Sequence, residues 1–309
     1  MGEGPVAAVR ERVGELSRRQ VLARAGVGVV ALLLLAGVAF YLYFGVLAHH
    51  APPAVSEEVR ADPGVTVEER YGGYVVRDAD LEPERLGIVF YPGARVAPDA
   101  YLPSAAAIAT RANATVVVPG MPANLAVLAP SRADAVLAGE PGVERWVVGG
   151  HSLGGAMACR YAADNAVEGL LLVGAYCDRP VRGMPALSVV GTRDVVLNRE
   201  RFAASMGNLP ASSAVVRVEG MNHSQAGWYG GQRGDQPARL TTPEAHHRLA
   251  NEVADWLCAD LDHCGDADAG SVSPSASQPA PPRDGRPPCR CSGRRGDPGV
   301  SGASPGPIQ

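Results

Sequence analysis

The sequence predicts one α/β domain with a mostly parallel sheet, helices on both faces and no lid domain, preceded by one transmembrane helix. Three observations lead to this prediction. Short apolar runs alternate with helical stretches in the middle of the chain, and a long uncharged apolar run lies near its beginning. A Gly-x-Ser-x-Gly segment also falls between one predicted strand and one predicted helix.

The composition excludes several classes of protein. The net charge is only -4, so the chain lacks the concentrated positive charge that nucleic-acid binding requires. A collagen-like repeat and a long heptad pattern are both missing, and six cysteines in 309 residues are too few for a disulfide scaffold. The central region of roughly 210 residues has the size of one α/β domain with a large core.

The chain divides into segments of different composition. They are an arginine-rich cytoplasmic segment (1–24), a transmembrane helix (25–48), a linker with two prolines (49–62), the α/β domain (63–264) and a tail rich in Pro, Gly and Ser (265–309). The tail lacks apolar periodicity, so we expect it to be disordered.

Residues 25–48 carry no charged side chain. As a helix they would span roughly 36 Å, which exceeds a hydrocarbon core of about 30 Å. Arginines precede this run and none follows until Arg60, so the positive-inside bias places the N-terminus in the cytoplasm and the domain outside. Alternatively, Arg18 and Arg19 belong to a twin-arginine export signal that is cleaved near Ala48. The apolar run is longer than a removable signal needs, which favours a retained anchor.

The strands and helices follow from the apolar pattern. A leading antiparallel pair is expected at 65–67 and 74–76. Further strands are predicted at 86–91, 115–118, 146–148, 169–173, 187–190 and 214–218, and helices at about 99–112, 132–139, 153–165, 199–207 and 243–261. Strands separated by helices imply a parallel sheet, whose reactive groups lie in loops beyond the carboxyl ends of the strands.

The segment Gly-His-Ser-Leu-Gly at 150–154 follows a predicted strand and precedes an alanine-rich helix. This is the context of a nucleophile elbow, in which a sharp turn presents the serine at the start of a helix. The turn leaves no room for side chains at 150 and 154, and the helix N-terminus favours developing negative charge. Ser152 is therefore the predicted nucleophile.

A serine nucleophile needs a base, and the base needs an acid that orients it. Asp194 follows the strand at 187–190, and His223 follows the last strand. The order Ser, Asp, His matches that of α/β-hydrolases. Asp178, after the preceding strand, is an alternative acid.

The oxyanion hole is expected from two backbone N–H groups. One belongs to Leu153, the residue after the nucleophile. The other belongs to Ala94, in the turn after the first central strand, where enzymes of this kind supply the second donor.

Several separated motifs occur in the right order for one family. They are Val-Phe-Tyr-Pro-Gly-Ala at 89–94, Met-Pro at 121–122, the elbow at 148–155, Asn-His-Ser-Gln at 222–225 and Gly-Asp at 234–235. Residues from about 85 to 260 thus resemble the compact "fold-5" branch of the alpha/beta-hydrolase family, which includes dienelactone-hydrolase-like and lipase-like esterases. The sequence departs from that branch at Val195, Ala123 and Ala226, which affects the substrate pocket and the acid loop more than the triad.

By resemblance, Ser152, Asp194 and His223 take the nucleophile, acid and base roles of that family. The implied function is a membrane-anchored serine hydrolase that cleaves carboxylic esters through an acyl-enzyme, without a metal or other cofactor. Expected partners are the membrane and a small ester or lipid-like substrate. The alternatives are an acyltransferase on the same triad and a catalytically silent, membrane-tethered binding domain.

The pocket is expected to be open, because the eleven residues at 176–186 are too few for a lid domain. It could be covered by the loop at 225–239. Candidate substrate contacts are Tyr91, Gln225, Trp228 and Tyr229.

The cysteines are treated separately. Cys159 and Cys177 are expected to be buried and inert. Cys258 and Cys264 could form a disulfide only if the helix that contains Cys258 ends between them, because six residues of helix separate Cα atoms by about 9 Å.

Overall fold

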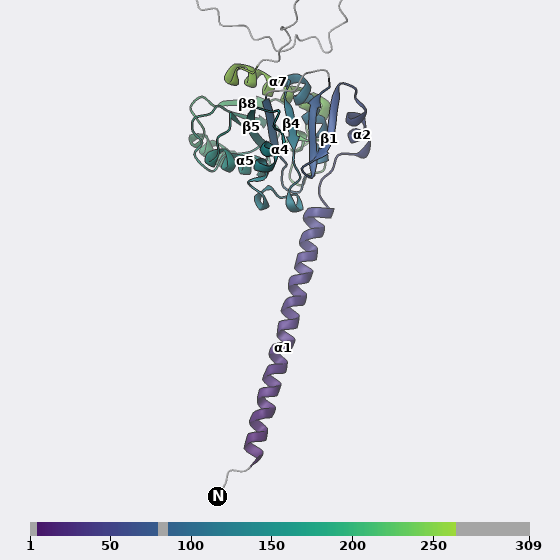
Figure 1. The fold of residues 1–309 in the computed structure, drawn as a ribbon, viewed down its shortest axis with the longest axis vertical. Helices are drawn as coiled ribbons and strands as arrows, with labels where there is room; N and C mark the ends of the chain where they lie inside the picture. The colour runs from purple at the N-terminus through teal and green to yellow at the C-terminus, as the bar shows by residue number, and fades with distance from the viewer. Residues whose placement is uncertain (1–4, 80–85, 264–309) are drawn as a thin grey trace, which may run out of the picture.

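The structure, a computed structural model, describes residues 5–79 and 86–263, with side chains from Arg18 onward. The predicted tail at 265–309 and Cys264 lie outside these residues. Within them, the chain forms an α/β domain from which one long helix projects (Figure 1).

The sheet of the described domain has eight strands in the order β1-β2-β4-β3-β5-β6-β7-β8. The strands are β1 (Val65–Arg70), β2 (Gly73–Asp78), β3 (Leu86–Tyr91), β4 (Thr115–Val118), β5 (Arg145–His151), β6 (Gly169–Val173), β7 (Ala186–Gly191) and β8 (Ala214–Val218). Strands β3 to β8 pair in parallel, whereas β2 pairs antiparallel with both β1 and β4. This arrangement confirms the predicted fold class.

Helices cover both faces of the sheet. They are α2 (Pro53–Ala61), α3 (Leu102–Ala112), α4 (Arg132–Gly139), α5 (Leu153–Asp164), α6 (Arg199–Ser205) and α7 (Thr242–Leu261). Apolar residues of α3 and α7 pack on one face of the sheet, and those of α4 and α5 pack on the other. Each central strand is buried on both sides, which is why these strands read as unbroken apolar runs.

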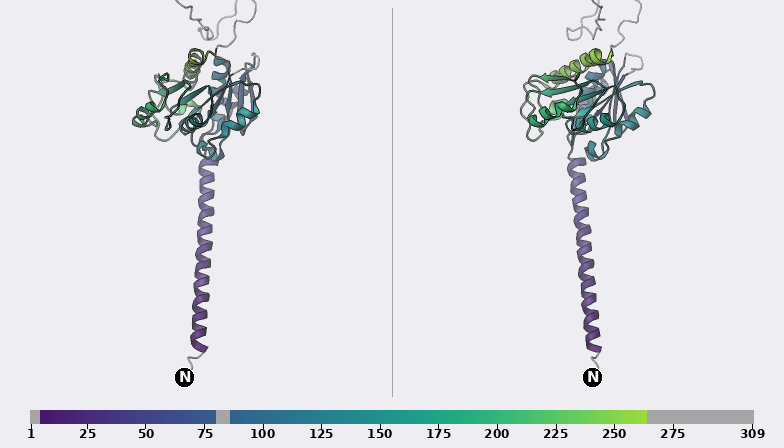
Figure 2. Two further views of the ribbon diagram at one scale, coloured as in Figure 1. Left: turned by 60° about the vertical axis from the view of Figure 1, so that its left-hand side comes forward. Right: turned by 90° about the vertical axis from the view of Figure 1, so that its left-hand side faces the viewer.

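Near the N-terminus, α1 (Pro5–Tyr41) continues into a short π-helix, η1 (Leu42–Val46). The stretch Arg18–Val46 is long and apolar enough to cross a membrane, and no part of its most apolar window is buried. This helix leaves the domain at the end away from α7 (Figure 2). Its length and composition fit either a signal anchor or a signal sequence.

The segment predicted as a linker at 49–62 contacts the domain along its length. His49 forms a parallel bridge with Val96, and its backbone carbonyl accepts a hydrogen bond from the Ala97 N–H at 2.9 Å. Helix α2 packs against α3 and β1, and Val59 contacts the apolar core. The prolines of this segment start a short helix instead of an extended spacer, since proline fits the first turn of a helix.

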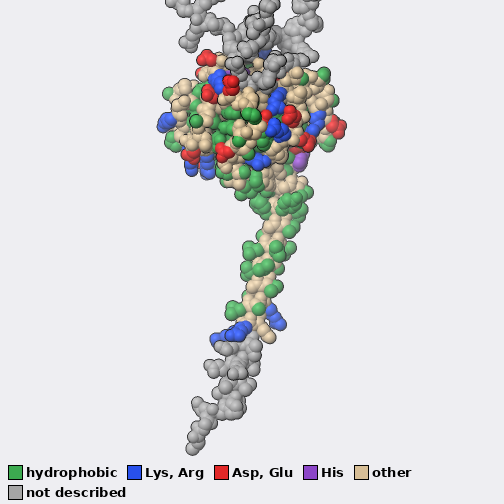
Figure 3. Space-filling view, viewed as in Figure 1, with side chains coloured by type: hydrophobic (Ala, Val, Ile, Leu, Met, Phe, Trp, Pro, Cys, Tyr) green, Lys and Arg blue, Asp and Glu red, His purple; other side chains and the backbone are tan. Residues whose placement is uncertain are grey.

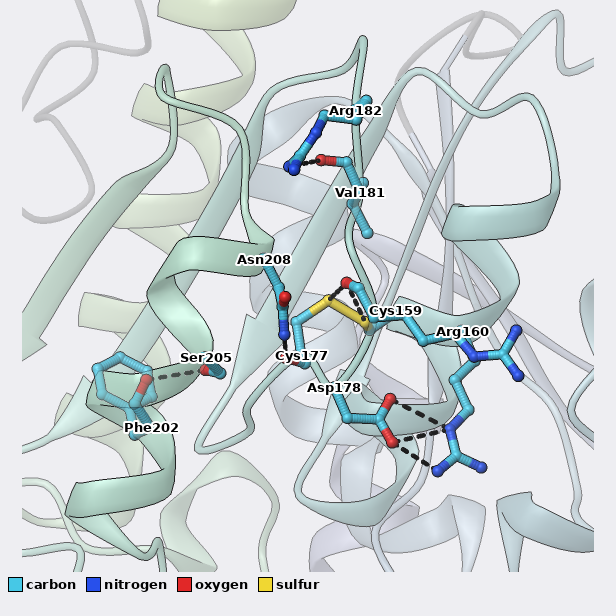
Figure 4. Close-up of a disulfide and its surroundings, with 10 residues drawn as sticks. Cys159, Arg160, Cys177, Asp178, Val181, Arg182, Phe202, Ser205 and Asn208 are labelled. Carbon is cyan, nitrogen blue, oxygen red and sulfur yellow. Dashed lines mark hydrogen bonds and ion pairs between the residues drawn. A yellow bond between two sulfur atoms is a disulfide. The ribbon is translucent and has the colours of Figure 1, made fainter.

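Cys159 and Cys177 are buried, as predicted, but they are bonded to each other in a disulfide, which the prediction of two inert residues did not include (Figure 4). Cys159 lies in α5 and Cys177 follows β6, and their Cα atoms are 5.4 Å apart. The two residues are 18 apart in sequence. Only the crossover from α5 to β6 brings them together, and this proximity has no local sequence signal.

The disulfide generates a stability prediction. Replacing both residues, Cys159→Ala with Cys177→Ala, should lower the free energy of unfolding by about 3 kcal/mol, because the bridge closes a loop of 18 residues in the unfolded chain. Urea unfolding of the full chain in detergent, followed by tryptophan fluorescence, measures this change. Equal stability of the oxidised parent and the double variant would contradict it.

A second prediction concerns pH. His246 in α7 is fully buried against the Trp228 ring, and this burial lowers its pKa to about 4. The unfolded chain binds a proton here near pH 6.5, so stability should fall as the pH drops from about 6.5 to 4, by up to about 3 kcal/mol.

Urea unfolding at pH 7 and pH 4.5 tests the role of His246. His246→Leu should flatten the pH dependence, whereas His247→Leu, at the exposed neighbouring position, should retain it. If His246→Leu loses as much stability between pH 7 and pH 4.5 as the parent does, groups other than His246 cause the pH dependence.

Candidate functional site

Ser152 lies at the turn between β5 and α5, as the sequence predicts. It is the N-cap of α5, with φ of 53° and ψ of −121°. A non-glycine residue in this region is strained by about 1–3 kcal/mol, and such strain is typical of functional sites. Its backbone N–H donates to the Val173 carbonyl of β6 at 3.0 Å, which holds the strained turn against the next strand.

The two glycines beside Ser152 are required by close packing. A Cβ at Gly150 would lie 2.6 Å from the Tyr91 carbonyl oxygen, and a Cβ at Gly154 would overlap the same oxygen. The absence of a side chain at both positions therefore allows α5 and its turn to pack closely against the carboxyl end of β3. This crowding confirms that the turn leaves no room for side chains at 150 and 154, and the end of β3 is one of the groups that cause it.

His223 and Asp194 form a buried pair. His223 Nδ1 and Asp194 Oδ2 are 2.8 Å apart, and each side chain is 1% exposed. The other carboxylate oxygen, Oδ1, accepts hydrogen bonds from the N–H groups of Val196 and Leu197 at 3.0 and 2.9 Å. The acid is thus held by its own loop and faces the imidazole.

Asp178, the alternative acid, lies elsewhere. Its carboxylate accepts hydrogen bonds from Arg160, and these lower its pKa (Figure 4). The structure therefore brings Asp194, not Asp178, to His223.

The loop that carries His223 is fixed by Asp235. Its carboxylate accepts hydrogen bonds from the N–H groups of His223 and Ser224 at 3.2 and 2.9 Å. Asp235 belongs to a motif used in the sequence analysis only for family resemblance. Its contacts give it a structural role, which is to hold the imidazole-bearing turn.

Ser152 and His223 line one cavity of about 320 Å³. The Nε2 atom of His223 is buried and has no hydrogen-bond partner among the described residues. The other lining residues come from α5, from the loops after β6 and β7, and from α6: Leu153, Ala156, Gly174, Ala175, Tyr176, Val196, Leu197, Asn198 and Arg201. The cavity is therefore built from the carboxyl ends of neighbouring parallel strands.

A second imidazole, that of His151, lies beside His223. The two ring centroids are 4.4 Å apart. His151 is buried, which lowers its pKa well below the usual range and keeps the ring neutral. Its Nδ1 is 2.9 Å from the Tyr101 hydroxyl, and that hydroxyl accepts a hydrogen bond from the Gly93 N–H at 2.9 Å. The tyrosine proton is then available to His151 Nδ1.

The sequence analysis used His151 only as part of the elbow motif and did not single out Tyr101. The place of His151 beside the serine in the motif indicates that it lies near the site. No sequence pattern indicates the same for Tyr101, because it lies at the start of a helix and 50 residues from His151.

The two predicted oxyanion donors differ in position. Leu153 is in the first turn of α5 and in the cavity wall. Ala94 is exposed in the turn after β3, and it is not among the residues that line the cavity. The Gly93 N–H next to it is already used by Tyr101.

The four predicted substrate contacts lie outside the cavity wall described above. The Tyr91 hydroxyl donates to the Pro130 carbonyl, so this side chain serves packing instead of substrate contact. The Gln225 amide donates to the Leu240 carbonyl. Trp228 packs against His246, and Tyr229 is buried with its hydroxyl bonded to Gln232. Each of these groups is engaged within its own loop or with neighbouring elements.

In the described part of the chain, no three His, Cys, Asp or Glu side chains gather closely enough to hold a metal ion. The site has instead a strained serine, a buried imidazole and a buried carboxylate. This combination can move a proton between an oxygen nucleophile and a leaving group.

Solved structures of three esterases or lipases resemble the chain. An esterase from Pseudomonas putida is 18% identical over 65% of this chain and 86% of its own, with a TM-score of 0.46. Carboxyl esterase 2 from Tuber melanosporum is 12% identical over 63% of this chain and 88% of its own, with a TM-score of 0.46. A hormone-sensitive lipase from a metagenome library is 15% identical over 67% of this chain and 89% of its own, with a TM-score of 0.49.

A search of curated protein sequences finds no match to the chain. The sequence profile described as "Alpha/beta hydrolase family" matches residues 87–247, which is 161 of the 309 residues. The matched region includes the elbow, the acid loop and the histidine loop. The chain belongs to the alpha/beta hydrolase family.

Proposed function

We propose that this protein is a membrane-anchored serine hydrolase of carboxylic esters. The observation that carries the proposal is the buried Asp194–His223 pair, whose free imidazole nitrogen lies at a cavity that is also lined by Ser152. An imidazole held by a carboxylate, with its second nitrogen toward a serine, is the arrangement of a nucleophilic triad.

The mechanism follows from these positions. His223 Nε2 takes the proton of Ser152 as Oγ attacks the carbonyl carbon of the ester, and Asp194 stabilises the imidazolium that forms. The oxyanion accepts a hydrogen bond from the N–H of Leu153, which lies in the cavity wall. The imidazolium then protonates the departing alcohol, which leaves an acyl-Ser152 intermediate. Water, deprotonated by His223, attacks this acyl group and releases the acid.

The anchor and its orientation are part of the proposal. Arg18, Arg19 and Arg24 precede the apolar helix, which favours a cytoplasmic N-terminus, and arginines also mark this end of the helix in Figure 3. The Cys159–Cys177 disulfide supports a domain outside the cytoplasm, because disulfides persist in oxidising compartments.

Contacts between η1 and the domain support a retained helix. Arg95 donates to the carbonyl oxygens of Tyr43 and Leu47, and Asn124 donates to that of Phe44. Cleavage near Ala48 would remove all three acceptors. The alternative of an exported and cleaved form predicts that these contacts are dispensable.

A fluorophosphonate probe tests the nucleophile. The full chain in detergent should be labelled at Ser152, and Ser152→Ala should abolish labelling while the protein stays folded. Failure of the folded parent to react would favour the silent binding domain. Product analysis with added alcohols then separates hydrolysis from acyl transfer.

The acid is tested by a matched pair of variants. Asp194→Asn should lower kcat by about 10⁴, because the imidazole loses its orienting acceptor. Asp178→Asn, at the alternative acid, should keep kcat near the parent value since its carboxylate binds Arg160. Initial rates on a short-chain nitrophenyl ester give kcat for both variants. A larger loss of kcat in Asp178→Asn than in Asp194→Asn would mean that Asp178, and not Asp194, is the acid of the triad.

His151 is expected to position the His223 ring without titrating. His151→Ala removes the ring that contacts His223 and should lower kcat by up to about a hundredfold, whereas His151→Phe should lower kcat less. Because buried His151 stays neutral, the acid limb of kcat/KM should have the same midpoint in His151→Phe as in the parent. A displaced midpoint would mean that His151 carries charge during the reaction.

A further inference from the structure

The apolar helix joins the domain at the catalytic edge of the sheet. The carboxyl ends of β3, β5, β6, β7 and β8 share this edge because the strands are parallel. Two residues in the loops after β3 and β4 bind the end of the helix. Arg95 donates hydrogen bonds to the carbonyl oxygens of Tyr43 and Leu47, and Asn124 donates one to that of Phe44. The same edge therefore carries both the anchor and the cavity.

The junction between the apolar helix and the domain is short, and side-chain and backbone contacts hold it. The Arg95 guanidinium lies 3.9 Å from the centroid of the Tyr43 ring. His49 follows at once and bridges to Val96, beyond the carboxyl end of β3. No spacer separates the last apolar residues of the helix from the domain, so this edge has little freedom to move away from the surface that the helix enters.

Exposed apolar side chains are concentrated on this edge. In the described domain after residue 47, four large apolar side chains are exposed: Val127, Leu128, Val195 and Val215. Val127 and Leu128 follow β4, and Val195 follows β7, so three of the four lie in loops at the catalytic edge. They are 46%, 53% and 47% exposed, respectively. Apolar side chains also continue from the helix onto the adjoining underside of the domain (Figure 3).

We propose that the catalytic edge rests on the bilayer that the helix spans, with Val127, Leu128 and Val195 in contact with lipid, and that the cavity takes ester substrates from that membrane. The cavity is lined by residues that follow β5, β6, β7 and β8, so the loop after β7 borders it directly, and β4 lies two strands from β5 in the same sheet. A substrate that leaves the bilayer at this edge reaches Ser152 without crossing bulk water. Apolar residues at an interface gain free energy from contact with acyl chains.

The contact surface is assigned to lipid because it is continuous with the anchor. A lipid surface lies beside the end of a membrane helix by necessity, whereas a protein partner would need a further recognition surface. The inference rests on the retained anchor and the ester hydrolysis proposed above, and the tests below separate these ideas.

The orientation is tested without activity. The full chain is reconstituted in phosphatidylcholine vesicles with and without lipids brominated on the acyl chain, and one tryptophan is added as Leu128→Trp or Val215→Trp. Val215 is the matched control, since it is exposed and lies near the amino end of β8, at the opposite edge. After subtraction of the parent signal, quenching of Leu128→Trp should exceed that of Val215→Trp by about twofold or more.

Equal quenching of the two variants would overturn the proposal. A blue-shifted Leu128→Trp that brominated lipid fails to quench would also overturn it, since that result indicates a protein partner on this surface.

The substrate source is tested by a ratio of rates. The full chain is given a short nitrophenyl ester in water and a long-chain nitrophenyl ester embedded in vesicles. Leu128→Asp should lower the ratio of embedded to soluble ester hydrolysis by about tenfold, and Val215→Asp should leave the ratio unchanged. An unchanged ratio in Leu128→Asp would refute the membrane source.

The hydrolase function and the membrane-facing orientation can fail separately, and the results distinguish the two cases. If neither ester is cleaved and the fluorophosphonate probe does not react, the proposed hydrolase function is wrong, but the quenching result still decides the orientation. If the soluble ester is cleaved and quenching is equal at both positions, only the membrane-facing edge is wrong.

Discussion

Strands β3 to β8 pair in parallel, so the loops that follow them all emerge at one end of the sheet. Side chains that follow β5, β7 and β8 come to one edge because these strands run in the same direction. Ser152, Asp194 and His223 are far apart in sequence, and the sheet alone makes them neighbours. The helix end meets this edge as well, because its binding loops follow β3 and β4.

Close packing turns this constraint into a defined geometry. The tight approach of the elbow to the end of β3 leaves space only for glycine at 150 and 154. The strained backbone of Ser152 is tolerated because the surrounding strands hold it. Two backbone donors hold the Asp194 carboxylate, and Asp235 holds the turn of His223. Each catalytic candidate is thus fixed by neighbours that do not react.

The imidazoles of His151 and His223 are both buried, and they differ in the side chain with which each is paired. Both histidines are buried, but only His223 has a carboxylate partner. Burial lowers the pKa of His151, whose partner is a neutral tyrosine, so its ring stays uncharged and packs against His223 without electrostatic repulsion. His246 in α7 is also buried, against the Trp228 ring, and its burial lowers its pKa.

Local sequence patterns determined the strands, most helix boundaries, the elbow and the order of the candidate triad, because apolar periodicity and turn glycines act over a few residues. The folded chain brings Asp194 instead of Asp178 to His223, pairs Cys159 with Cys177, and places Tyr101 beside His151, none of which follows from local sequence. It also packed residues 49–62 onto the domain and turned the catalytic edge toward the apolar helix. These features are contacts between distant segments, and their free energies depend on which elements the whole fold brings together.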